Sequence, residues 1–414
     1  MTGKHDYYDE LETRDPQRRE KELFARLPEQ IANAQRNAPG FTRILADVDA
    51  QACNTRVALA QLPVTRKSDL IELQKQDRPF GGLAATPISA LGRVFGSPGP
   101  IYEPEANRPD YWRMARALYT AGFRKGDLVH NTFSYHFSPA GSMLESGAFA
   151  LGCVVCPAGV GQTELQVHTI SDLKPNGYVG TPSFLKIILE KAAELGRDVS
   201  SVRKALVSGE ALPPSLRSAI NEHGIEILQC YATADLGLIA YETKAQEGLI
   251  LDEEVILEII RPGTGEPVPE GEVGEVVITT LNADYPLIRF GTGDLSAILP
   301  GVSPCGRTNA RIKGWMGRAD QTTKVRGMFV HPSQVNDIVK RHMEVMRARL
   351  VIDSDGTTDI MTLQCEVEDE SADLPEAVTQ SIREVCKLRG KATFVDPGSL
   401  PNDGKVIDDI RKYD

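Results

Sequence analysis

The sequence predicts an α/β fold: a large N-terminal domain of helix-covered, mainly parallel sheets with a β-rich subdomain, then a small mobile α+β domain. From about residue 111 to 230, helical patterns alternate with short apolar strands, as in a parallel sheet with helices on both faces. β-rich segments replace this alternation after about residue 245, and the last section mixes both element types. The length of 414 residues accommodates two or three domains.

The first predicted helix covers Pro16 to Ala38, where apolar positions recur at helical spacing until Asn37-Ala-Pro-Gly40 stops the pattern. Short apolar runs predict the sheet that follows, because a strand buried on both faces carries few polar residues. These strands are 128–132, 153–157, 177–179, 204–207 and 225–230, and the helices between them are 111–121, 140–151, 163–173 and 183–195.

The β-rich subdomain is predicted from strands 255–260, 273–279 and 295–299. Pro262 to Gly265 reads as a turn, and Glu270 to Glu275 as a hairpin turn that enters a strand. The last section contains predicted helices at 334–344 and 374–388 and strands at 348–352 and 362–367. We therefore predict an N-terminal domain 1–318, with its β-rich subdomain at about 245–318, and a C-terminal lid domain 319–414.

Composition argues against several classes of protein. A net charge of -11 and a pI near 5.3 disfavour an extended nucleic-acid surface, which needs clustered Lys and Arg. The N-terminus does not resemble a signal peptide and no run of 18 apolar residues occurs, so we expect a cytoplasmic protein. Seven scattered cysteines predict reduced thiols, and the pair Cys153 and Cys156 lies in an apolar run typical of a buried strand.

A lysine near the C-terminus is the first candidate for chemistry. Asn402, Asp403 and Gly404 favour a tight turn, so Lys405 is expected to project from a loop. Its ammonium group could then reach a centre where a carboxylate reacts with a phosphate. An isolated Gly-Lys would read as an ordinary solvated lysine near a chain end, and the interpretation depends on the segments below.

Two candidate nucleotide segments are predicted loops. Arg93 to Pro100, with Ser97 and Gly99, reads as a Gly/Ser/Pro turn whose backbone N–H groups could cradle a polyphosphate. Ser208, Gly209 and Glu210 follow strand 204–207, at the carboxyl end where open α/β sheets bind ligands. Each alone also fits an ordinary loop.

Three further segments supply candidate acidic and basic side chains. Tyr231-Ala232-Thr233-Ala234-Asp235 follows strand 225–230, so a ring could stack on a base while Asp235 coordinates Mg²⁺. Asp294, after a predicted glycine-flanked turn, suits the hydroxyls of a ribose. The third segment lies at the domain boundary and supplies Arg318 for phosphate or ribose, Asp320 as a hinge, and the loop at Gly327.

With these motifs the chain resembles the acyl-adenylate-forming (AMP-binding) ligases, and among them the phenylacetate–coenzyme A ligase family. The similarity runs nearly end to end and is more specific in the C-terminal half. The matching segments are Leu62 to Leu70, Gly180 to Phe184, Arg289 to Asp294, Cys305 to Thr308, Gly317 to Asp320 and Gly404 to Asp408.

The resemblance implies a reaction in two steps. A carboxylate, expected to be a small aromatic or other organic acid, attacks the ATP α-phosphate, and coenzyme A then displaces AMP from the acyl-adenylate. Lys405 and Mg²⁺ would neutralise the developing charge, and the lid would rotate between steps. Family members often form homodimers. The other implied roles are Tyr231 beside the adenine, Gly209 and Glu210 in the nucleotide pocket, Asp235 on the Mg²⁺ side, Asp294 and Arg318 at the ribose, Asp320 as hinge and Gly327 in the thioester step.

Position along the chain also suggests walls for the acyl pocket. By resemblance, Tyr135, His136, Phe137 and Gly159 belong to two loops that line it. His136 could gate or polarise the acid, and the alternative is a packed or solvent-facing histidine.

The sequence departs from the family pattern at three places. Prolines replace a threonine and the lysine of the phosphate loop, which removes backbone donors and a charge and predicts weaker ATP binding or turnover. An aspartate, Asp235, stands where the family has glutamate. Of a cysteine set that holds zinc in some members only Cys305 remains, with Ser303 beside it, so we expect no zinc.

Two alternatives to an acid–coenzyme A ligase stay open at this level. The altered phosphate loop favours a homologue without turnover that works as a ligand-binding or accessory subunit, whereas Asp294, Arg318 and Lys405 favour a ligase. An adenylating enzyme that passes the acyl group to an amine or a carrier protein is the other.

Overall fold

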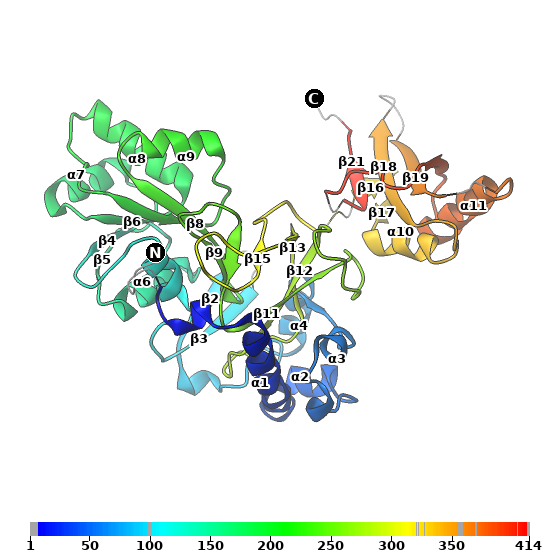
Figure 1. Cartoon of the computed structure of the whole chain (residues 1–414), viewed down its shortest axis with the longest axis horizontal. Coiled ribbons are helices and arrows are strands. Elements are labelled where there is room, and N and C mark those ends of the chain that lie inside the picture. The colour runs from blue at the N-terminus through cyan, green and yellow to red at the C-terminus, as the bar shows by residue number, and fades with distance from the viewer. Residues whose placement is uncertain are drawn as a thin grey trace. The chain divides into compact units, whose positions relative to one another are not determined.

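The structure is a computed structural model that describes residues 7–97, 101–319, 321, 323–326, 328–354, 359–368, 371–403 and 405–411 (Figure 1). The chain divides into two compact units. Unit 1 comprises Met1–Leu257, Ile278–Phe290 and Leu299–Trp315; unit 2 comprises Glu258–Val277, Gly291–Ile298 and Met316–Asp414.

The N-terminal part of unit 1 contains one long helix, with short helices before and after it along the chain. Helix α1 spans Pro16–Asn37, close to the predicted range, because the Asp15 side chain caps its first turn and Pro16 occupies the first helical position. A hairpin of β2 (Leu91–Ser97) and β3 (Ile101–Ala106) follows. The remaining elements before it are η1 (Glu10–Thr13), α2 (Pro39–Ile44), η2 (Ala50–Ala52), α3 (Arg56–Ala60), β1 (Thr65–Arg66), η3 (Lys67–Asp69), α4 (Leu70–Gln76) and η4 (Ile88–Ala90).

The predicted alternation of helices and strands builds a nine-stranded sheet in the order β14-β15-β10-β9-β8-β7-β6-β4-β5. Strands β8, β7, β6, β4 and β5 are parallel, and the pairs β8–β9, β9–β10 and β10–β15 are antiparallel. The parallel strands are β4 (Leu128–Asn131), β5 (Val154–Pro157), β6 (Gly177–Gly180), β7 (Lys204–Val207) and β8 (Glu226–Thr233); the others are β9 (Gly237–Glu242), β10 (Leu249–Leu251), β14 (Ile298–Leu299) and β15 (Arg311–Ile312).

Helices cover both faces of the parallel strands, as predicted. Alternate residues serve the two faces: Tyr178 packs in one core with α7, α8 and α9, while its neighbour Val179 packs in another with α5 and α6. Figure 1 shows α7, α8 and α9 gathered on one side of β6 and β8. These helices are α5 (Met114–Thr120), α6 (Ala140–Ala150), α7 (Thr163–Leu173), α8 (Pro182–Glu194) and α9 (Pro214–Asn221).

One predicted turn is wrong, and the described part of a second is strand. Arg289 to Asp294 belongs largely to strand β13 (Phe290–Ser296), which lies in a sheet ordered β1-β13-β12-β11 with β12 (Gly274–Thr280) and β11 (Val255–Ile260). Glycine is used at position 293 for close approach, since a Cβ there would lie 2.8 Å from Arg318 Nη2. In the Arg93 to Pro100 segment, residues up to Ser97 form strand β2, and residues 98–100 lie outside the described residues.

The C-terminal part of unit 2 has its own core under a four-stranded sheet, β20-β19-β18-β21. Strands β18 (Arg347–Ser354) and β19 (Asp359–Glu366) and helices α10 (Pro332–Val339) and α11 (Leu374–Cys386) match the predicted elements, although α10 ends earlier. Strands β20 (Lys391–Val395) and β21 (Ile407–Asp409), with the hairpin β16 (Thr323–Val325) and β17 (Met328–Val330), were not predicted. Within the part of the chain that the structure describes, no helix has the length and apolar character needed to cross a membrane.

Candidate functional site

Five loops of unit 1 meet at one edge of the parallel sheet. Because β4 to β8 are parallel, the residues that follow their carboxyl ends lie along the same edge. This brings together most of the predicted site residues of unit 1. The loops are residues 132–138, 158–161, 181–183, 208–210 and 234–236.

The loop after β7 is fastened to its neighbours by hydrogen bonds. The Ser208 backbone donates to Gly180 O at 3.2 Å, and its hydroxyl donates to Cys230 O at 2.9 Å. Gly209 has a φ of +85°, which favours glycine. A Glu210 carboxylate oxygen accepts from Ser183 N at 2.6 Å, at the N-terminus of α8. This turn is therefore held in a defined position at the edge.

The loop after β8 places Asp235 in a buried ion pair. The strand carries a bulge between Tyr231 and Ala232, and the Thr233 hydroxyl accepts from Leu236 N in the turn to β9. The Asp235 side chain is fully buried, and Lys67 Nζ lies 2.6 Å from its Oδ2. Its other oxygen, Oδ1, is buried without a hydrogen-bond partner among the described residues. A carboxylate buried this deeply needs the ammonium group beside it.

Sequence reasoning missed Lys67 as a site residue. It lies in the matching segment Leu62 to Leu70, which was the available signal, but nothing in the sequence pairs it with Asp235, 168 positions away. Arg289 is buried and binds the backbone on both sides of this segment's start. Its Nη1 donates to Ala60 O at 2.8 Å and to Leu62 O at 2.5 Å, and its carbonyl accepts from Thr65 N. These hydrogen bonds hold the backbone near Lys67 in a defined position.

A second buried acid, Glu103, lies on β3 near the end of the β2–β3 hairpin where Ser97 pairs with Ile101. Ser97 Oγ donates to Glu103 Oε1 at 2.5 Å, while Oε2 has no partner among the described residues. The pKa of Glu103 is raised from 4.5 to about 7, mainly by burial; Asp235 contributes to the rise, and Ser97 and Lys67 oppose it. No local pattern pointed to this acid, because its burial comes from tertiary packing.

The raised pKa of Glu103 predicts a pH-dependent stability. The folded protein binds this proton more tightly than the unfolded chain, so stability is lost as pH rises from about 4.5 towards 7. Glu103→Gln removes the charge and keeps an acceptor for Ser97. We expect the variant to exceed the wild type by about 3 kcal/mol in unfolding free energy at pH 8, and to match it near pH 4.5, in urea denaturation across pH. An equal difference at both pH values would contradict this account.

In unit 2, the structure brings Asp294 and Arg318 together. Arg318 Nη1 lies 2.8 Å from Asp294 Oδ1, and the two residues form an isolated β-bridge. Asp294 is 8% exposed, whereas the Arg318 side chain is 54% exposed. The buried acid therefore holds a guanidinium that faces solvent, as a group for binding an anion or a diol requires.

Lys405 lies in unit 2 just before β21. Its side chain is about half exposed, and Nζ pairs with Asp408 Oδ1 at 2.7 Å. The backbone around it is held firmly, since Gln321 Oε1 accepts from the N–H groups of Val406 and Ile407, and Arg349 Nε donates to Lys405 O. The lysine is thus presented on an anchored segment.

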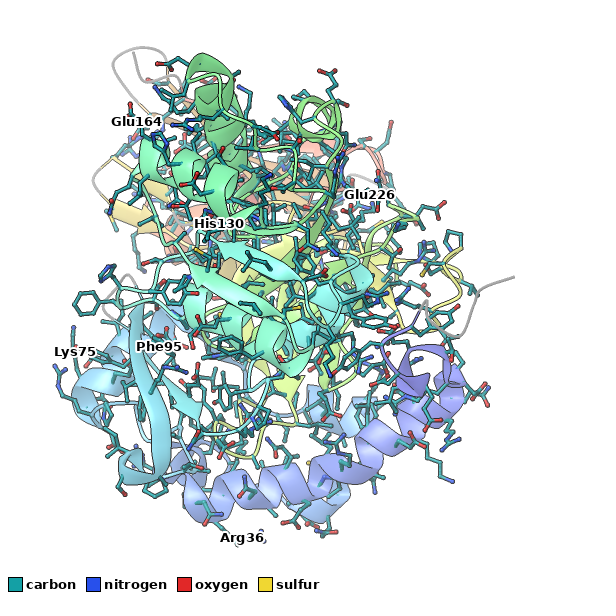
Figure 2. The ribbon with its side chains drawn as sticks, turned by 90° about the vertical axis from the view of Figure 1, so that its left-hand side faces the viewer. Arg36, Lys75, Phe95, His130, Glu164 and Glu226 are labelled. Atoms are coloured by element: carbon teal, nitrogen blue, oxygen red, sulfur yellow. The ribbon has the colours of Figure 1, made fainter. Side chains whose placement is uncertain are left out.

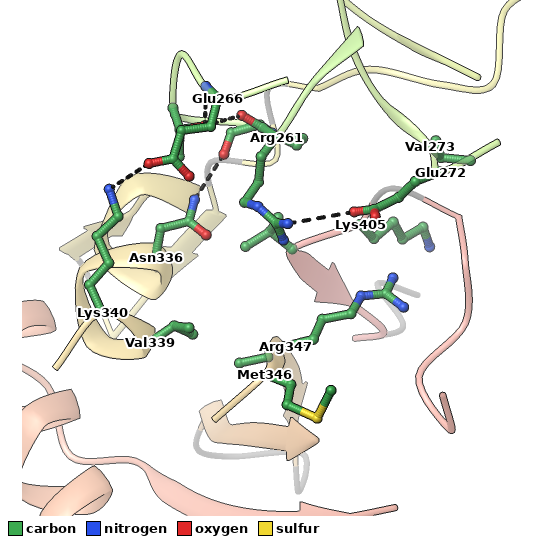
Figure 3. Close-up of a pocket in the computed structure, with 14 residues that line it drawn as sticks. Arg261, Glu266, Glu272, Val273, Asn336, Val339, Lys340, Met346, Arg347 and Lys405 are labelled. Carbon is green, nitrogen blue, oxygen red and sulfur yellow. Dashed lines mark hydrogen bonds and ion pairs between the residues drawn. The ribbon is translucent and has the colours of Figure 1, made fainter. Parts of the chain in front are cut away.

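Figure 3 shows a pocket in unit 2 that Lys405 lines, together with three other basic side chains. Two of these already pair with acids, Lys340 with Glu266 at 3.3 Å and Arg261 with Glu272 at 3.8 Å. The predicted residues Gly99, Asp320 and Gly327 lie outside the described residues.

Among the predicted acyl-pocket residues, Tyr135 has hydrogen-bond partners within the protein, whereas His136 and Phe137 are exposed. The Tyr135 hydroxyl accepts from Asn131 Nδ2 at 2.8 Å and donates to Glu145 at 2.9 Å; burial and Glu145 raise its pKa well above the usual range. His136 is exposed, and Phe137 is 86% exposed with a φ of +60°. Gly96 N donates to Phe137 O, so this loop contacts strand β2. Gly159 has a φ of +69°, with its carbonyl bound by a side chain of α7.

Comparison with known proteins gives a consistent result. A family model described as AMP-binding enzyme matches residues 110–282. The phenylacetate–coenzyme A ligase of Thermus thermophilus is 30% identical over 450 residues, covering 98% of this chain and all of that protein. The ligase of the same name from Aromatoleum evansii is 30% identical over 364 residues, 84% of this chain and 81% of that protein.

A solved structure has the same fold. A 2-hydroxyisobutyryl-CoA ligase in an open conformation, in complex with 2-HIB-AMP and CoA, superposes with a TM-score of 0.73 at 24% identity, covering 97% of this chain and 93% of that one. The level of identity to whole ligases, the matching domain model and the shared fold agree. The chain therefore belongs to the phenylacetate–coenzyme A ligase family of AMP-binding enzymes.

Proposed function

We propose that this protein activates a small carboxylic acid with ATP as an acyl-adenylate and then transfers the acyl group to coenzyme A. One observation carries the proposal: residues predicted for a nucleotide, from separate segments, reach one edge of the sheet in a chain similar along its whole length to a phenylacetate–coenzyme A ligase. That edge is where open α/β sheets bind ligands. We place the reaction in the cytoplasm and expect a homodimer.

The proposed nucleotide roles are those that the family resemblance implies. In this proposal Tyr231 stacks beside the adenine and the turn of Gly209 and Glu210 supports the pocket. Ser97, the last residue of β2, contacts the phosphates. In unit 2, Asp294 and Arg318 take the ribose hydroxyls and the phosphate edge, because a carboxylate accepts from hydroxyls and a guanidinium donates to phosphate.

Mg²⁺ fits this chain through Asp235. Its Oδ1 is a buried oxygen with no hydrogen-bond partner among the described residues, and Mg²⁺ is usually held by few carboxylates, several waters and substrate phosphates. When bound, the ion would supply charge neutralisation for the phosphates. The partner oxygen remains with Lys67, which keeps a positive charge beside Asp235.

Lys405 is the proposed catalytic residue. Its ammonium would leave Asp408 and stabilise the charge that develops as the carboxylate attacks the α-phosphate. We propose that the lid then turns about Asp320, withdraws Lys405 and brings the Gly327 loop into place for the thioester step.

The acid is proposed to be aromatic or another small organic acid, held between the loops of Tyr135 to Phe137 and of Gly159. A second candidate function is a homologue without turnover, which the prolines beside Ser97 favour. Transfer to an amine or a carrier protein is the remaining alternative for the second step.

The test measures MgATP binding by calorimetry and pyrophosphate release over a panel of aryl and alkyl carboxylic acids, with and without coenzyme A. Acid-dependent release together with a coenzyme A-dependent thioester is the expected result. Release without thioester formation would identify a different acceptor. A folded protein that binds no nucleotide would refute the ligase and leave the binding subunit.

A further inference from the structure

A buried polar pair links the sheet to helix α7. His130 lies on β4 and Gln166 on α7, and both side chains are buried, at 0% and 3% exposure. The distance from His130 Nε2 to Gln166 Oε1 is 2.5 Å. Figure 2 places His130 in the middle of unit 1, within the layer of the sheet. Burial lowers the pKa of His130, which keeps the ring neutral at physiological pH.

The other end of Gln166 holds the loop after β5. Gln166 Nε2 donates to Gly159 O at 2.9 Å and to Gly161 O at 3.2 Å. Backbone carbonyls only accept, so the amide nitrogen must face them and Oε1 must face the histidine. That orientation requires His130 to carry its proton on Nε2. One donor–acceptor chain therefore runs from the strand through α7 to the loop.

Packing does little to shape this loop. Gly159 and Gly161 have φ values of +69° and +73°, and a Cβ built at either would meet no atom within 4 Å. Val160 between them is 59% exposed. The backbone of Gly159 is tied at its N–H to Asn131 O at 3.0 Å. In addition to that hydrogen bond, the two hydrogen bonds from the Gln166 amide hold the two glycines in position.

Two neighbouring residues on β4 hold the two loops of the proposed acyl pocket, and the Asn131 backbone also binds Gly159. Successive strand residues face opposite sides of a sheet. His130 acts on residues 158–161 through Gln166, whereas Asn131 Nδ2 donates to the Tyr135 hydroxyl and to Gly141 O at 2.9 Å. The positions of both loops are thus set by buried amide groups rather than by contacts with an acid.

We propose that Gln166, oriented by His130, is a positioning residue that selects which acids the enzyme accepts by fixing the 158–161 loop. This inference rests on the proposed function, because it takes that loop as a wall of the acyl pocket. It assigns Gln166 no contact with reacting atoms. Its removal should change acid recognition and leave nucleotide recognition intact.

The test compares Gln166→Leu, His130→Gln and the control Leu165→Ala, an exposed neighbour on α7. KM and kcat are measured for ATP and for acids of graded size. Gln166→Leu should raise KM for the preferred acid roughly tenfold and change the order of preference among acids, with KM for ATP within about twofold of the wild-type value. His130→Gln keeps a donor for Oε1 and should retain the wild-type order, as should Leu165→Ala.

An unchanged order of acids in Gln166→Leu, or equal losses for acid and ATP, would overturn the inference while leaving the ligase intact. A wild type that activates no acid would refute the proposed function, and the inference with it. If Gln166→Leu fails to fold, Gln166→Met supplies the same comparison. Nitrogen NMR of the folded wild type adds an independent readout: a His130 proton on Nδ1 instead of Nε2 would contradict the chain of hydrogen bonds.

Discussion

Lys405→Ala is expected to lower the rate of acyl-adenylate formation by roughly 10²–10³-fold, the usual cost of removing one group that stabilises transition-state charge. The lysine is half exposed, and among the described residues its ammonium group pairs with Asp408 on the same segment, so its loss should not disturb the core of unit 2. Pyrophosphate release in single-turnover experiments measures the effect. The melting temperature should stay close to that of the wild type.

Two comparisons make the Lys405 result specific. Lys340→Ala removes another exposed lysine of unit 2, paired with Glu266 at 3.3 Å, and should leave the rate nearly unchanged. Supplying a preformed acyl-adenylate with coenzyme A should restore thioester formation in Lys405→Ala, since we propose that the lysine acts in the first step only. Equal losses in both half-reactions would assign Lys405 a general structural role.

Lys67→Met is expected to destabilise unit 1 by about 3–5 kcal/mol, the cost of leaving a buried charge without its partner. Asp235 is fully buried, its Oδ2 pairs with Lys67 at 2.6 Å and its Oδ1 has no partner among the described residues. Urea denaturation measures the loss. MgATP binding should weaken as well, because the variant removes a positive charge near the proposed phosphate site.

Removing the charge of Asp235 as well distinguishes the ion pair of Lys67 from the packing of its side chain. Lys67→Met with Asp235→Asn should recover most of the stability lost by Lys67→Met alone, because no uncompensated charge remains. Lys75→Met is the matched control: this lysine pairs with Glu72 at 3.5 Å with both side chains exposed, and should cost less than about 1 kcal/mol. A double variant as unstable as Lys67→Met would show that the methylene stem of Lys67, and not its charge, supports the site.

The parallel sheet was predictable because its signal is local. Apolar strands such as 204–207, alternating with helical patterns, require burial on both faces, and the structure confirms this arrangement. The turn chemistry before Lys405 and the strand-end positions of Ser208 and Asp235 are also local, and so were visible. Strand β13 was mistaken for a turn because Gly293 serves close packing against Arg318, which a local pattern cannot reveal.

The layered α/β class, the family and the candidates at the ends of strands were predictable, because periodicity, turn residues and motifs are signals within short segments. Tertiary structure alone decided the partners: Lys67 beside Asp235, Ser97 on Glu103, Arg318 on Asp294, and the His130–Gln166 link. The physical reason is that burial turns an ordinary charged or polar side chain into one that must be paired. Which residue supplies the partner depends on how distant segments pack, and that packing also gives Glu103 its raised pKa.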